Sequence, residues 1–197
     1  MEYWLIKKFR RLSSSEAKLL EQHKKAEIQE KLNREEVEKF EQESKVPGSY
    51  ARTKTLEADY CINAEHVAGL PISEGTETYI YRGKDKVIFE RNQDTFELDI
   101  KKVRDILLKT DVEIQKSYVS SAGGAIGGYA LFGPLGALIG GRSKEKQSKI
   151  EEKYLIFSYE KDGELDFISF NVTKEPKAIF FINHYDLSSQ ERRTQVL

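Results

Sequence analysis

A run of 20 residues from Ala122 to Gly141, AGGAIGGYALFGPLGALIGG, constrains this chain more than any other stretch. The run contains eight of the 13 glycines and no charged residue, in a chain that is 33% charged. Glycine costs a helix up to about 1 kcal/mol relative to alanine, so the run needs a favourable environment to become ordered. Its large apolar side chains need burial in lipid, in the chain's own core or in a partner. We therefore expect structure that depends on contact.

The length of this run does not make it a simple membrane span. As a helix, residues 119–141 would be about 35 Å long, which matches a hydrocarbon core of roughly 30 Å. However, the strand patterns before and after the run indicate one domain, so the chain must return to the side that it left. Gly133-Pro134 supplies the return, because proline begins helices and glycine ends them. We predict a two-armed helical hairpin over 119–142.

Within each arm, glycines recur four residues apart, a spacing that lets two helix backbones approach closely. The residues expected to make a self-association or membrane contact are Gly123, Gly124, Gly127, Gly128, Leu131, Phe132, Gly133, Pro134, Leu135, Gly136, Leu138, Ile139 and Gly140. The large residues among them should point away from the glycine seam. Three environments stay open for them: the sheet domain of the same chain, a second copy, and lipid.

Two further segments are candidates for membrane contact. A basic flank that suits anionic headgroups follows the run. It consists of Arg142, Lys144, Lys146 and Lys149. The N-terminus combines aromatic and basic residues, as membrane-surface helices do. Its candidate residues are Trp4, Leu5, Lys8, Phe9 and Arg11. The alternative for this segment is a first helix that docks on the domain.

A long charged helix is predicted after the N-terminal segment. Ser13 to Ser15 supply an N-cap, Glu16 completes a capping box, and the charged sequence runs to about Glu43. The apolar stripe is too thin for a fully buried helix. The helix therefore either faces solvent, lies loosely on the domain, or pairs with another copy. We assign residues 1–45 to this segment and residues 46–65 to a linker.

A β domain is expected over 66–187, with residues 188–197 as a flexible tail. Three short strands with one solvent-exposed face cover Thr76 to Ile100, and a hairpin covers Lys153 to Val172. Between them, the pattern of Lys102 to Tyr118 favours a helical turn first and a strand second. A helix begins near Thr173, with Pro176 in its first turn. The fold class is therefore α+β, a small antiparallel barrel or a strongly bent sheet, capped by its last helix.

Three stretches resemble a known family. HVAGLP at 66–71, the run LFGPLGALIGG, and KYLIFSYEKDGE at 153–164 are similar to bacterial PH-like domains of the GRAM/PH superfamily. The resemblance covers His66 to Leu187. It implies a PH-type barrel with a C-terminal helix, no catalytic centre, and docking to membranes or proteins.

Composition excludes several other functions. A net charge of −1 and a pI near 6.4 argue against a nucleic-acid partner. The single cysteine, Cys61, cannot form an internal disulfide, and no secretion signal is recognisable, so we expect a cytoplasmic protein. Cys61, His66 and His184 lack metal-ligand spacing and an orienting third residue, so we expect no enzyme, metal or cofactor.

The sequence thus predicts a non-enzymatic PH-like module whose glycine hairpin mediates self-association, membrane contact at the inner face, or both. A homo-oligomer is the expected state. The alternatives are a soluble protein-interaction module, such as a phage- or prophage-encoded regulator or inhibitor, and an effector that permeabilises membranes.

Overall fold

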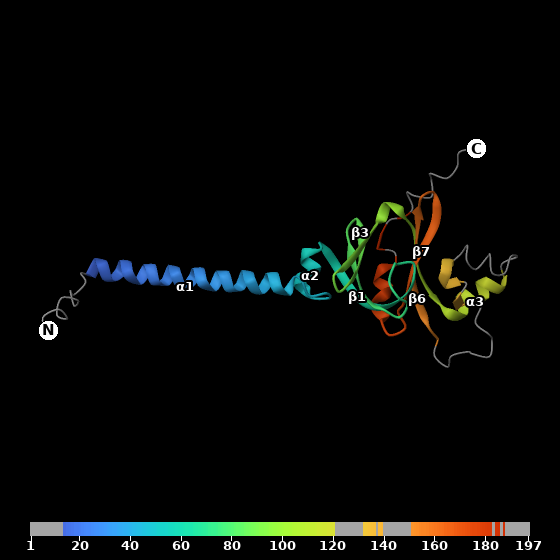
Figure 1. The fold of residues 1–197 in the computed structure, drawn as a ribbon, viewed down its shortest axis with the longest axis horizontal. Coiled ribbons are helices and arrows are strands. Elements are labelled where there is room, and N and C mark those ends of the chain that lie inside the picture. Colours follow the sequence, from blue (N-terminus) through green and yellow to red (C-terminus); the bar gives the residue numbers. More distant parts are fainter. Residues whose placement is uncertain are drawn as a thin grey trace.

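The computed structural model describes residues 14–120, 132–136, 138–139, 151–182, 184–185 and 187. The fold is α+β: a long N-terminal helix leads into a domain built on one seven-stranded antiparallel sheet (Figure 1). The elements are α1 (Ser14–Glu43), α2 (Tyr50–Thr55), β1 (Ala58–Ala68), β2 (Glu77–Gly83), β3 (Lys86–Arg91), β4 (Asp94–Asp99), η2 (Ile100–Lys102), β5 (Val103–Thr110), α3 (Asp111–Ser120), β6 (Lys153–Lys161), β7 (Glu164–Asn171) and η4 (Pro176–Phe181).

The sheet is open, so the prediction of a closed barrel was wrong. Its strand order is β4-β3-β2-β1-β7-β6-β5, which makes β4 and β5 the two edges. Only the three residues of η2 separate these edges in sequence, so the sheet must bend strongly to bring them together. The Asp99 side chain caps η2 by accepting a hydrogen bond from the Lys101 backbone N–H at 2.8 Å. This turn connects β4 directly to β5, but the two strands do not pair with each other.

The main core lies on the inner face of the bent sheet and draws on every strand. Its centre is aromatic: the rings of Phe89 and Phe170 stack at 5.3 Å, and Phe157 packs edge-on against both. Ala178 and Phe181 of η4 close it. A helix was predicted here, but η4 is a 3₁₀-helix of six residues, because Ile182 takes extended backbone angles and ends it.

The three strands β2 to β4 and the hairpin β6–β7 lie where the alternating pattern predicted them. The solvent-exposed face is confirmed only at the edge, where Glu97 and Asp99 are exposed. In β3, the residues from Val87 to Glu90 are all buried, because α2 and its flanking turns cover the outer face.

Two predicted segments have a different structure. The interval 46–65 was expected to be a linker, yet it contains α2 and most of β1, the central strand. β1 does not alternate cleanly because it has bulges at both ends and its neighbours cover parts of both faces.

The order of elements in 103–120 is the reverse of the predicted one: a strand comes first and a helix second. The cause is a capping box. The Thr110 backbone N–H donates to Glu113 Oε2 at 2.8 Å, and the Glu113 backbone N–H donates to Thr110 Oγ1 at 3.2 Å. These two bonds satisfy amide groups at the start of α3 and make a helix begin at Asp111.

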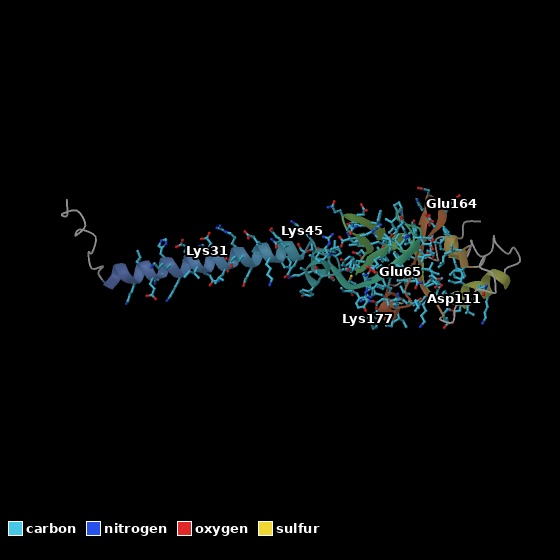
Figure 2. The ribbon with its side chains drawn as sticks, turned by 60° about the horizontal axis from the view of Figure 1, so that its bottom comes forward. Lys31, Lys45, Glu65, Asp111, Glu164 and Lys177 are labelled. Carbon is cyan, nitrogen blue, oxygen red and sulfur yellow. The ribbon has the colours of Figure 1, made fainter. Side chains whose placement is uncertain are left out.

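The long charged helix is confirmed as α1, 30 residues that project away from the sheet (Figure 1). Figure 2 shows its side chains extending on every side, with no other element beside Lys31. Every described side chain from Lys18 to Glu43 is exposed. α1 therefore does not lie on the domain, and its described side chains face solvent in the single chain.

Candidate functional site

The glycine-rich run lies in an insertion between two neighbouring strands. β5 and β6 pair antiparallel along their whole length, from Val103 opposite Tyr159 to Thr110 opposite Lys153. Residues 111–152 therefore leave the sheet and return to it, as predicted from the strands on both sides. Among the described residues, no helix is both long enough and apolar enough to cross a membrane.

The second predicted arm, Pro134 to Gly141, packs on the outer face of the sheet through its described residues, together with Phe132, the last residue of the first predicted arm. Residues 132–136 and 138–139 are helical, and Phe132, Leu135 and Ile139 are at most 5% exposed. With Ile114 of α3, they form a second apolar cluster over the outward side chains of β6 and β7. Those outward side chains are Tyr154, Ile156 and Phe167. The arm and α3 together make a helical layer at the end of the domain opposite α1 (Figure 1).

Gly133 fits this packing in a way that no other residue would. Its φ of +58° lies in the left-handed region, and a Cβ at this position would stand 2.4 Å from the Phe167 ring. Pro134 follows directly, half-buried. The Gly133-Pro134 pair therefore allows the chain to turn while it lies against β7.

The structure gives the predicted site residues different positions. Gly136 is buried with the three apolar anchors of the second arm, whereas Leu138 is 39% exposed. The other glycines of the arms, Leu131, the basic flank and the N-terminal candidates lie outside the described residues. These are Gly123, Gly124, Gly127, Gly128, Gly140, Arg142, Lys144, Lys146, Lys149, Trp4, Leu5, Lys8, Phe9 and Arg11.

A second site, which the sequence interpretation missed, joins α1 to the sheet. Arg52 of α2 forms an ion pair with Glu90 of β3, whose Oε1 and Oε2 lie 2.9 Å and 3.1 Å from Arg52 Nε. The Glu90 side chain is 3% exposed. Tyr81 Oη donates to Glu90 Oε2 at 3.0 Å and accepts from the Gly48 backbone N–H. A buried carboxylate thus receives hydrogen bonds from two elements.

The same network holds the end of α1. Ser49 caps α2 by accepting from the Arg52 backbone N–H, and its hydroxyl donates to the Glu43 carbonyl at 2.8 Å. Arg52 Nη1 donates to the Ser44 carbonyl at 3.4 Å. Lys54 Nζ lies 5.7 Å from the centre of the Phe40 ring, within cation–π range. These contacts fix the direction in which α1 leaves the domain.

The residues weighed for catalysis have structural roles. Cys61 is partly buried, and burial raises the pKa of its thiol to about 12, far from the range of a reactive thiolate. His66 Nε2 accepts from the Leu70 backbone N–H at 3.1 Å, and Nδ1 lies 3.3 Å from the Ser73 carbonyl. His66 therefore organises the turn that contains Gly69. In the described part of the chain, no group of three metal-ligating side chains is close enough to hold an ion.

Basic residues at the first hairpin turn are engaged within the domain. Arg82 pairs with Asp59 at 2.8 Å and donates to the Phe180 carbonyl. Lys86 pairs with Glu97 at 2.7 Å. Neither side chain offers an unpaired cation to a lipid headgroup.

Comparison with known proteins gives no relative: no family model, no curated protein and no solved structure matches this chain. The resemblance to PH-like domains therefore stays a prediction from the three stretches quoted above. The function must be inferred from the geometry of this chain alone.

Proposed function

We propose that this protein is a non-enzymatic docking module whose glycine-rich hairpin forms an intermolecular contact, with self-association as the leading mode. The observation that carries the proposal is the division of the second arm into two sides. Phe132, Leu135 and Ile139 anchor the arm on the sheet, while Leu138 faces outward. The arm is thus held on the sheet by one side, while Leu138 on the other side is exposed and can contact a partner.

The anchoring also acts on the first arm. Residues 121–131, which contain four of the glycines, connect the end of α3 to the anchored Phe132. The described residues on either side of this segment, Ile114 of α3 and Phe132, both belong to the cluster on the outer face of the sheet, so both ends of the segment start from that face. The layer lies opposite α1, so α1 does not obstruct it (Figure 1).

Self-association is favoured over membrane insertion because few large apolar side chains remain to enter lipid. Three of the large apolar side chains that could enter lipid are already buried in the chain's own sheet. The glycine spacing, in contrast, suits the close approach of two helix backbones, which needs few large side chains. Membrane contact remains the alternative mode, and the basic flank supports it.

The test compares wild type with the double variant Gly124→Leu, Gly128→Leu, and uses Gly124→Ala, Gly128→Ala as the matched control. Alanine keeps the surface small, whereas leucine blocks close approach. We expect wild type and the alanine control to be oligomers by light scattering, and the leucine variant to be a monomer with an unchanged melting temperature. Equal masses for all three proteins would refute self-association through the glycine-rich hairpin. Flotation of both wild type and the leucine variant with anionic phosphatidylglycerol vesicles would instead support the membrane mode, because leucine favours contact with lipid.

A protein-interaction module is the second candidate. The same burial of Phe132, Leu135 and Ile139 supports it, because a hairpin fully packed on its own sheet would leave a monomer. In that case, the purified chain should be a monomer with and without detergent and should recover one stoichiometric partner from a bacterial lysate.

A further inference from the structure

α1 lacks the packing that normally stabilises a helix of its length. It is 30 residues, about 45 Å, and its apolar side chains stay in water: Leu19 is 65%, Ile28 59% and Leu32 49% exposed. Helices in proteins owe most of their stability to an apolar face packed against another element. The exposed apolar side chains of α1 are therefore free to pack against a partner.

One stripe of α1 has the spacing of a two-stranded coiled coil. Starting at residue 21, it advances by four, three, four, three and four residues, which is the 3.5-residue period of such a seam. The stripe consists of Glu21, Lys25, Ile28, Leu32, Glu35 and Lys39. Two apolar residues stand at its centre, with one acidic and one basic residue on either side.

The order of these residues makes the stripe complementary to itself when it is reversed. In an antiparallel pair centred between Ile28 and Leu32, each of these two residues meets the other. The remaining contacts are Glu21 with Lys39 and Lys25 with Glu35, each made twice. In a parallel pair in register, each of the four charged residues would face the same residue of the other copy, so that like charges would be opposite each other. Like charges at facing positions destabilise a pair, so the charge pattern selects the antiparallel orientation.

We propose that α1 binds a second copy of this chain as an antiparallel two-helix coiled coil through the stripe from Glu21 to Lys39. This contact is separate from the glycine hairpin and does not depend on the function proposed for it. Figure 1 shows α1 extending clear of the sheet, so a second helix can lie along it and the two sheet domains come to opposite ends. The anchoring of Glu43 and Ser44 by Ser49 and Arg52 keeps the domain away from the seam.

The contact should be weak and reversible. Only two apolar side chains from each chain lie at the centre, and the ion pairs remain near solvent, where Lys25 already contacts Glu21 of its own helix at 2.9 Å. Such small interfaces belong to transient complexes. We expect half-association at a concentration on the order of 100 µM, with marked weakening at high salt.

Charge exchange tests both the contact and its orientation in the full chain. Lys25→Glu places glutamate opposite Glu35 of the other copy, and Glu35→Lys places lysine opposite Lys25. We expect each single variant to lose association by at least about tenfold in sedimentation equilibrium, and an equimolar mixture of the two to recover it. The double variant Lys25→Glu, Glu35→Lys should also recover it, because both cross pairs are restored with exchanged signs.

The design separates this proposal from its competitors. Association through the glycine hairpin would be equal in all samples, since no variant touches residues 119–142. A parallel pair would already place like charges opposite each other at positions 25 and 35. In that case the single variants and the double variant would associate no more weakly than wild type, and the mixture would associate more strongly than wild type. Circular dichroism of each single variant checks that α1 stays helical. A mixture that associates no better than its components, or single variants that associate like wild type, would overturn the proposal.

Discussion

Truncation of Leu135 is the most direct test of whether the second arm is docked on the sheet. The Leu135 side chain is fully buried, and it belongs to the same cluster as Ile114, Tyr154 and Phe167. Leu135→Ala removes this side chain and leaves a cavity, so we expect a loss of about 2–5 kcal/mol in the free energy of unfolding. With a urea m-value of about 2 kcal/mol per molar, the midpoint should fall by roughly 1–2.5 M.

Leu138 provides the matched control, because it lies three residues further along the same arm and is 39% exposed. Leu138→Ala should therefore change the free energy of unfolding by less than about 1 kcal/mol. Urea unfolding followed by tyrosine fluorescence and by circular dichroism measures both variants and checks that the transition is two-state. Equal midpoints for the two variants would refute the docked arm, and with it the division of the arm on which the proposed function rests.

Three further predictions concern buried polar groups. Because burial raises the pKa of Cys61 to about 12, a thiol reagent should label the native protein about 10³-fold more slowly than the unfolded one at pH 8, with a tenfold gain per pH unit. Burial lowers the pKa of His66, so its stabilising contribution is complete above about pH 6.5 and is lost as the pH falls. The urea midpoint should accordingly fall between pH 7 and 5, and fall less in His66→Gln. Arg52→Met leaves the Glu90 carboxylate buried without its partner, so it should cost about 3–5 kcal/mol, part of which Arg52→Met, Glu90→Gln should recover.

The parts of the fold that the sequence predicted are those set by local contacts. Short strands with alternating residues and tight turns gave β2 to β4 and the β6–β7 hairpin correctly. Their turns contain Asn92 and Asp162 with φ of +51° and +53°, a conformation that asparagine and aspartate tolerate. The long charged helix, α1, was equally a prediction from local sequence. In each case, the signal and the interaction lie within a few residues of each other.

The missed parts depend on residues far away in the sequence. β1 pairs with β7 across about 100 residues, and neither its central position nor its two covered faces can be read from its own pattern. The sequence of an edge strand likewise does not show that the sheet stays open. Neither β4 nor β5 differs in composition from a strand that would complete a barrel.

For the candidate site, one available signal went unused. Tyr154 to Ser158 in β6 are buried without interruption, which in a strand means that both faces are covered. The run YLIFS would therefore have indicated a layer on the outer face of the sheet, where the described residues of the second arm lie. The sequence could not show which environment buries Phe132, Leu135 and Ile139, because such apolar side chains suit lipid, a partner or the chain's own core.

The insertion between β5 and β6 also affects the order in which the molecule can fold. A tight hairpin closes a loop of a few residues, whereas pairing Thr110 with Lys153 closes one of about forty, which costs roughly 2 kcal/mol more in chain entropy. The meander of β2, β3 and β4 has no such delay, and all of it precedes the insertion along the chain. During synthesis, these three strands can therefore form before β6 and β7 leave the ribosome. Until those strands arrive, Leu107 of β5 and Ile114 of α3 lack the packing partners that they have in the folded domain.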